Sequence, residues 1–297
     1  MTRILTFLLA LLAVSARSAD FHVYYLGGQS NMDGYGFVSE LPEDLRGEVD
    51  GVWIFHGNMG KDGTPPDGRG MWSILKPGHG RSFASDGYAN RYSDRFGPEL
   101  TFALAMKKKY PERNIALIKY SRGGTSIDAD ASAATRFGCW DPEWQGGEGE
   151  GKGVNQYDHF LATLANARAD TDIDNDGEAD RLIPAGILWM QGESDAQEPE
   201  VAEEYEENLR ELMTCIRRDF GNEDARVVIG RITDWEVWKL GDVVRAAQAE
   251  FVRKDGNAAL VTSTDSYGNS DKWHYDTPGY LDLGRKFAEA MVARASE

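Results

Sequence analysis

Three apolar stretches of this 297-residue chain each run directly into a turn of small or polar residues, and this pattern constrains the fold most strongly. They cover residues 21–26, 115–120 and 183–190, and their branched and aromatic side chains favour buried strands. Helical spacing of apolar residues appears between the strands. Strands that alternate with helices predict a mostly parallel sheet with helices on both faces, which is a three-layer α/β/α sandwich.

Other segments complete this alternation. Further strands are expected at residues 52–55, 226–230 and 259–262. Helices are expected to begin near residue 97 and to cover residues 158–169, 201–216, 242–253 and 278–295. Irregular loops are predicted at residues 57–96 and 128–153, which lack periodicity. No linker, composition break or repeat follows residue 20, so we expect one domain over residues 20–297.

Residues 1–19 have the pattern of a secretory signal peptide. Arg3 gives a basic start, residues 4–14 are apolar, and small residues follow up to Ala19. The apolar run is too short for a membrane span, and no later run approaches that length. Cleavage fits after Ala16 or after Ala19, and we favour the second site. The mature protein is therefore expected to be secreted or periplasmic, without a membrane partner.

The chain carries a formal net charge of −17. Such an acidic body argues against nucleic acid or an anionic membrane as a partner, because both repel negative charge. The two cysteines, Cys139 and Cys215, either pair in an oxidising compartment or stay free, and the sequence leaves both states open.

Ser30 follows the first strand and its two closing glycines. In open α/β sheets, ligands bind at the carboxyl ends of the strands. The N–H groups of a turn that opens a helix point outward and favour negative charge. A serine raised there can be a nucleophile whose own N–H helps to hold an oxyanion. The alternative is an ordinary turn in which Ser30 caps a helix.

Asp271 and His274 lie three residues apart in the loop before the last expected helix. At this spacing the carboxylate can reach one imidazole nitrogen while the other nitrogen faces outward. The carboxylate then fixes the tautomer, and the histidine serves as the base for a serine. Among five histidines, only His274 has a carboxylate so placed. Alternatively, the two residues form a capping and solvent-exposed pair before Pro278.

Four sequence blocks combine these candidates with two further turns. The blocks are Gly28-Gln29-Ser30-Asn31-Met32, Gly123-Gly124-Thr125-Ser126-Ile127, Gln191-Gly192-Glu193-Ser194-Asp195 and Asp271-x-x-His274. They stand in the order found in the sialate O-acetylesterase-like carbohydrate esterases, a branch of the SGNH hydrolases (carbohydrate-esterase family six). The chain resembles this family from residue 20 nearly to its end. The resemblance implies the flavodoxin-like α/β/α fold of SGNH hydrolases and a serine esterase activity.

The resemblance also implies the roles of the site residues. Ser30 would be the nucleophile, His274 the general base and acid, and Asp271 the residue that orients it. The oxyanion hole would consist of the N–H groups of Ser30 and Gly124 and the side-chain amide of Gln191. Removing one such donor typically costs a hundredfold or more in rate, on the order of 3 kcal/mol.

Supporting and substrate-binding roles are assigned to a second group of residues. Gln29 is expected to order the turn around the nucleophile, and Glu193 to hold the turn around Gln191. Gly123 is a supporting residue, and its N–H is the less favoured alternative to that of Gly124 in the oxyanion hole. Glu193 is equally a carboxylate at a helix start. Trp273 is a candidate sugar-stacking residue, and Arg122 a candidate partner for an acidic sugar.

The stretch from Asp172 to Asp180 has carboxylates at alternate positions and a glycine at a bend. Asp172, Asp174, Asp176 and Asp180 therefore form a candidate structural calcium loop, since calcium prefers oxygen ligands. A full EF-hand would have Glu where Ile183 stands, so only a one-sided loop is expected. The alternative is a solvated acidic turn.

These observations predict an exported serine esterase that removes acetyl groups from carbohydrates through an acyl-enzyme, with no cofactor for catalysis. An esterase for lipid, aryl or other non-sugar esters, or for an unusual sulfated or acidic glycan, is the alternative within the enzyme class. A glycan-binding domain of the same fold without catalysis is the alternative outside it, but such a domain would be expected to lack a triad member, and all three are present.

Overall fold

The computed structural model describes residues 18–60, 64–146 and 154–293. One seven-stranded sheet runs through the middle, in the order β11-β10-β9-β1-β8-β3-β4. All neighbouring strands are parallel except β3 and β4. The predicted mostly parallel sheet is therefore confirmed. Its strands are β1 (Asp20–Gly28), β3 (Val52–His56), β4 (Trp72–Ile74), β8 (Asn114–Ser121), β9 (Arg181–Met190), β10 (Arg226–Gly230) and β11 (Ala258–Val261).

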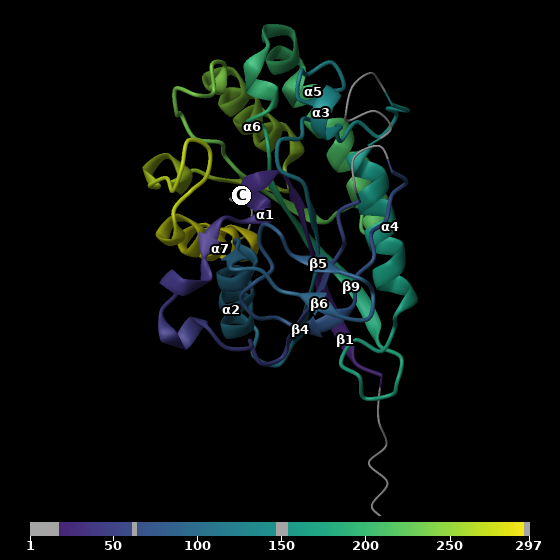
Figure 1. Cartoon of the computed structure of the whole chain (residues 1–297). Helices are drawn as coiled ribbons and strands as arrows, with labels where there is room; N and C mark the ends of the chain where they lie inside the picture. The colour runs from purple at the N-terminus through teal and green to yellow at the C-terminus, as the bar shows by residue number, and fades with distance from the viewer. Residues whose placement is uncertain (1–17, 61–63, 147–153, 294–297) are drawn as a thin grey trace, which may run out of the picture.

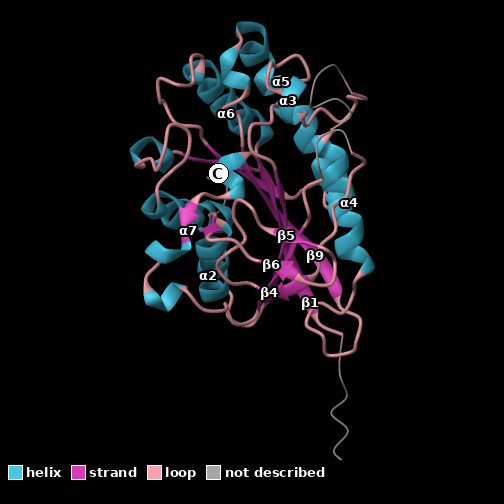
Figure 2. Cartoon of the chain, in the orientation of Figure 1, coloured by secondary structure: helices cyan, strands magenta, loops and turns pink. Residues whose placement is uncertain are grey.

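Helices cover both faces of this sheet, as Figures 1 and 2 show. Helices α2 and α7 pack together on one face, α4 and α5 cover the other, and α6 packs against α5. The three layers agree with the α/β/α sandwich expected from the sequence. The helices are α2 (Glu99–Lys109), α4 (Gln156–Ala169), α5 (Pro199–Phe220), α6 (Gly241–Asp255) and α7 (Thr277–Val292).

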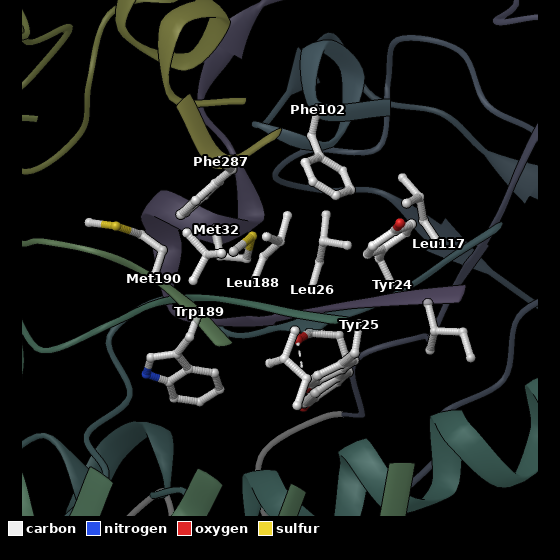
Figure 3. Packing of buried hydrophobic residues seen from close by; sticks show 14 of the residues in the cluster. Tyr24, Tyr25, Leu26, Met32, Phe102, Leu117, Leu188, Trp189, Met190 and Phe287 are labelled. Carbon is white, nitrogen blue, oxygen red and sulfur yellow. Dashed lines mark hydrogen bonds between the residues drawn. The ribbon is translucent and has the colours of Figure 1, made fainter. Parts of the chain in front are cut away.

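The central strand β1 sends side chains into both apolar layers. The Tyr24 ring meets Phe102 of α2 edge-on at 5.2 Å, and the Tyr25 ring lies 4.6 Å from Phe160 of α4. Figure 3 shows Phe102 and Phe287 on one side of the strand, with Trp189 and Tyr25 on the other. A parallel strand buried on both faces has apolar side chains on both, which explains the aromatic and branched run from Val23 to Leu26.

Helix α5 has the clearest local sequence signals. Pro199 stands in its first turn, and Gly221 ends it in the left-handed conformation, where its N–H bonds the Arg217 and Arg218 carbonyls. Apolar residues at helical spacing form one buried face. This face comprises Val201, Ala202, Tyr205, Leu209, Leu212, Met213, Ile216 and Phe220.

The prediction that residues 57–96 form an irregular loop is wrong in part. Strand β4 extends the main sheet, and two small antiparallel pairs lie outside it. Each of these strands has only two or three residues, too few to give a periodic pattern. A further helix, α3 (Ala134–Phe137), lies in the second predicted loop. The small pairs are β2 (Gly36–Phe37) with β7 (Arg95–Phe96), and β5 (Ala84–Ser85) with β6 (Asn90–Arg91).

Several expectations concern the chain ends and the cysteines. The predicted signal peptide lies almost wholly in residues 1–17, outside the described residues. Ala19 already joins the fold, since its N–H donates to Asp180 and its carbonyl accepts from the Arg181 N–H. Cys139 and Cys215 are both free thiols. In the described part of the chain, every helix is too short or too polar to cross a membrane.

Candidate active site

Ser30 begins the short helix α1 (Ser30–Asp33) directly after β1. Gly28 has φ of +137°, and a Cβ there would lie 2.0 Å from the Met190 carbonyl oxygen. Only glycine therefore lets the ends of β1 and β9 approach this closely. Ser30 is 7% exposed and lines a pocket of about 490 Å³.

The turns after β1, β8 and β9 meet at Ser30. The Arg122 N–H donates to the Gly28 carbonyl at 3.1 Å, and the Gln29 N–H donates to the Met190 carbonyl at 2.9 Å. A Cβ on Gly123 would lie 3.2 Å from the Ser30 Cβ. The carboxyl ends of three parallel strands thus surround one serine, as the topology requires.

Asp271 holds both the ring and the backbone of His274. Its Oδ2 lies 2.7 Å from His274 Nδ1, while its Oδ1 accepts the N–H groups of Trp273 at 2.8 Å and His274 at 3.0 Å. Burial would raise the pKa of Asp271, but the hydrogen bonds from His274 and the backbone outweigh it and lower that pKa. With Nδ1 so engaged, Nε2 is the nitrogen left for chemistry.

His274 is suited to act as a base. Burial lowers the pKa of His274 below its usual value, although the Asp271 carboxylate acts in the opposite direction. The imidazole is therefore neutral at neutral pH. The Tyr35 ring stacks on it with 3.5 Å between ring centroids and an angle of 6°. Tyr35 follows α1 in the chain, so it also links the serine segment to the histidine, and no sequence pattern marked it.

The pocket brings together most of the predicted site residues. Ser30, Gly123, Gly124, Trp273 and His274 all line it. The N–H groups of Ser30 and Gly124 donate to no protein acceptor in the described part of the chain. They are thus available to an oxyanion, and a φ of +80° explains the glycine at position 124.

The structure does not place the Gln191 side chain as an oxyanion donor. Gln191 is fully buried and does not line the pocket. Its Nε2 donates one hydrogen to the Thr125 carbonyl and the other to Asp195. Because an amide nitrogen carries only two hydrogens, neither remains for a ligand. The expected oxyanion role of the Gln191 side chain is therefore wrong, because Asp195 binds one of its two amide hydrogens. Asp195 lies four residues further along the chain, and the sequence did not reveal this contact.

The structure also does not place Arg122 where it was expected, at the pocket as a partner for an acidic sugar. Its side chain reaches the Gly60 carbonyl at 3.4 Å and does not line the pocket. Two other arginines do line it, Arg81 from the long loop before α2 and Arg136 from α3. Trp238 joins Trp273 in the wall. Arg81 lies in a loop without periodicity and Arg136 in a four-residue helix, so no sequence signal connected these two arginines with Ser30.

The supporting residues Gln29 and Glu193 bridge the turns. Gln29 Oε1 accepts the N–H groups of Gly192 and Ser194 at 3.3 and 3.4 Å. Glu193 Oε1 accepts from Asn31 Nδ2 at 2.7 Å. Burial raises the pKa of Glu193 to about 7, although that hydrogen bond acts in the opposite direction. Glu193 thus contacts the turn that carries Ser30 directly.

Three of the four expected calcium ligands cluster. Asp172, Asp174 and Asp176 each offer an oxygen within 4.8 Å of the others, so this acidic group could hold an ion. Burial and the neighbouring carboxylates raise the pKa of Asp174. Asp180 does not join them, since its oxygens accept the N–H groups of Ala19 and Ile173. Its role is to tie the loop to the start of the sheet.

Comparison with solved structures supports this fold. A protein from Arabidopsis thaliana superposes with a TM-score of 0.65 at 20% identity, over 94% of this chain and all of that one. A carbohydrate acetylesterase from Xanthomonas citri gives a TM-score of 0.59 at 18% identity, over 91% of this chain and 55% of that one. These likenesses establish the class of fold, which is an α/β/α sandwich.

Sequence comparison gives the family. The model of the family described as "Carbohydrate esterase, sialic acid-specific acetylesterase" matches residues 20–293. A probable carbohydrate esterase of Arabidopsis thaliana is 23% identical over 280 residues, which are 91% of this chain and 90% of that one. The chain belongs to this family of carbohydrate esterases and is a carboxylic ester hydrolase. The resemblance inferred from the four sequence blocks is therefore confirmed.

Proposed function

We propose that the protein is a serine esterase that removes acetyl groups from a carbohydrate through an acyl-enzyme on Ser30. The observation that carries this proposal is the shared pocket of Ser30 and His274, with Asp271 bonded to the far nitrogen of the imidazole. A neutral imidazole beside a serine at the end of a strand is the arrangement that activates a hydroxyl.

The reaction follows from this geometry in two stages. Ser30 Oγ attacks the ester carbonyl, and its proton passes to His274 Nε2. The N–H groups of Ser30 and Gly124 hold the oxyanion, and the sugar alcohol leaves with the proton from His274. Water then gives a proton to His274 and attacks the acyl-enzyme, which releases acetate and restores Ser30. The structure holds no Ser30–His274 hydrogen bond, and such bonds commonly tighten on substrate binding.

The direct test compares turnover of p-nitrophenyl acetate by the wild-type protein and by Ser30→Ala. We expect the variant to lose at least about a thousandfold in kcat, because the nucleophile is gone. A fluorophosphonate should label Ser30 in the wild type. Equal turnover by both proteins, or labelling of another serine, would contradict the proposal.

The substrate class is proposed to be an acetylated carbohydrate that carries an acid group. Trp273 is 46% exposed and offers a flat apolar face at the pocket, as sugar-binding sites do. Arg81 and Arg136 are exposed cations in the wall of an otherwise strongly acidic protein. Guanidinium groups bind carboxylates by paired hydrogen bonds. The family description, sialic acid-specific, agrees with an acidic sugar.

Two further proposals concern the rest of the chain. Residues 1–19 would be removed as a signal peptide during export, which leaves residues 20–297 as one secreted or periplasmic domain. N-terminal sequencing of the exported protein tests this, and an intact Met1 would contradict it.

The second proposal is that Asp172, Asp174 and Asp176 hold a structural calcium ion. Their oxygens suit this cation, and Asp172 Oδ1 is buried without a protein partner.

A further inference from the structure

Asn31, the residue after the candidate nucleophile, is 2% exposed and uses every hydrogen-bonding position of its side chain. Its Nδ2 donates to Glu193 Oε1 at 2.7 Å and to the Trp273 carbonyl at 3.1 Å. Its Oδ1 accepts from the Tyr280 hydroxyl at 2.8 Å and from the Tyr275 N–H at 3.4 Å. A backbone N–H can only donate, so Tyr275 fixes which way the amide faces.

Two of these partners flank His274 in the chain. The Asn31 amide therefore bonds the backbone immediately before the imidazole, at Trp273, and immediately after it, at Tyr275. Within the described residues, every hydrogen bond between residues 29–33 and 271–275 passes through Asn31. Asp271, in contrast, bonds only within its own loop and orients the ring without fixing its distance from Ser30.

Glu193 anchors the amide from a third direction. It stands in the turn after β9, and the Gly192 and Ser194 N–H groups on either side of it donate to Gln29. Asn31 thus joins the β9 turn and the His274 loop at a residue covalently bonded to Ser30. A satisfied buried network of this kind holds its members in one arrangement.

We propose that Asn31 is a positioning residue that holds His274 in register with Ser30, an inference that rests on the proposed serine esterase function. Without the amide, the His274 loop loses its polar attachment to the nucleophile turn. A misplacement of about 1 Å between reacting groups costs on the order of a hundredfold in rate. The loss should fall on kcat, because Asn31 does not line the pocket in which a small ester would bind.

The test compares Asn31→Ala with Asn155→Ala. Asn155 is a matched control, since it is 4% exposed and its amide also makes four hydrogen bonds, at the start of α4 and outside the pocket wall. Both variants should lose thermal stability. Only Asn31→Ala should lower kcat for p-nitrophenyl acetate by on the order of a hundredfold, with KM within about twofold and a matching fall in the rate of Ser30 labelling.

A second pair of variants separates positioning from folding. Asn31→Asp places a carboxylate against Glu193, and the double variant Asn31→Asp with Glu193→Gln restores that hydrogen bond with the donor on the other side. The double variant should recover thermal stability relative to Asn31→Asp. Its kcat should stay low, because an aspartate cannot donate to the Trp273 carbonyl.

The outcomes distinguish this inference from the proposed function. If Ser30→Ala keeps wild-type turnover, the serine esterase proposal itself fails. If Ser30→Ala is inactive while Asn31→Ala keeps the kcat of Asn155→Ala, only the positioning role is overturned. Recovery of wild-type kcat in the double variant would overturn it as well.

Discussion

At the scale of single residues, the site depends on side chains that make several contacts at once. Asp271 accepts hydrogen bonds from two backbone N–H groups and from the His274 imidazole, so one carboxylate both shapes the loop and orients the ring. Gln191 is the opposite case, because both hydrogens of its side-chain amide are donated to Thr125 and Asp195 and none remains for a ligand. A residue type at a motif position therefore does not by itself give the role, because neighbours compete for the same hydrogens.

If His274 is the base of the proposed reaction, its protonation sets the pH dependence of activity. Burial lowers its pKa below the usual 6.5, so the midpoint of the acidic limb of kcat/KM should lie below pH 6.5, where the imidazole gains a proton. Asp271→Asn removes a charge that raises this pKa. The acidic limb should then move to lower pH, while the plateau falls on the order of a thousandfold or more.

The control for this profile is Asp276→Asn. It removes the same charge nearby, at the N-terminal cap of α7, and an asparagine can keep the cap bond to the Gly279 N–H. Its acidic limb should match the wild type. A limb that moves to higher pH in Asp271→Asn would contradict the assignment of His274 as the base.

Recognition of an acidic sugar is tested at Arg81 and Arg136. Replacing either by alanine should raise KM for a carboxylate-bearing acetylated sugar by about tenfold, the value of one charge-assisted hydrogen bond. KM for neutral p-nitrophenyl acetate should not change. Arg113→Ala removes an exposed arginine outside the pocket wall and serves as the charge control. If the Arg81 and Arg136 variants changed KM equally for both substrates, these arginines would not recognise the carboxylate.

At the scale of elements, the strand ends decide where chemistry occurs. Gly28 lets β1 touch β9, and Gly123 lets the β8 turn approach Ser30. Both positions are visible in the sequence as glycines after apolar runs. The two-residue strands in the long loop before α2 were not predictable, because two residues are too few to give a period.

The acidic loop before β9 yields an element-scale prediction. If calcium binds there, millimolar calcium should raise Tm by several degrees over the chelated protein, because a ligand that binds only the folded state stabilises it. Asp174→Asn should abolish that rise. Asp44→Asn, at an exposed acid elsewhere, should leave it intact. The absence of any calcium-dependent shift in the wild type would refute the proposed ion site.

At the scale of the whole molecule, buried carboxyl groups near the site make folding stability depend on pH. Burial raises the pKa of Glu193 from 4.5 to about 7. Between these values the folded protein holds a proton that the unfolded chain releases, so this group's contribution to stability falls as pH rises. Burial also raises the pKa of Asp195 to about 7, so its contribution to stability falls with rising pH in the same way.

Glu193→Gln isolates this contribution. A glutamine keeps an acceptor for Asn31 and does not titrate, so the variant should gain stability relative to the wild type as pH rises from about 5 to about 8. Urea unfolding at several pH values measures the difference. Glu43→Gln, at an exposed position, should run parallel to the wild type. A difference for Glu193→Gln that does not vary with pH would show that the group does not titrate in this range.

The sequence by itself determined the layered fold, the serine turn and the local Asp271–His274 pair. The periodicity of apolar residues indicates the strands and helices, and Asp271 and His274 are close enough in the chain to contact each other without help from a distant segment. Tertiary structure alone decided which arginines face the pocket, that Gln191 is committed to Asp195, and that Asn31 holds the His274 loop. These contacts join side chains that become close only when the strands assemble into the sheet. Their hydrogen bonds depend on which neighbouring groups compete for the same donors and acceptors, and the sequence pattern does not show this.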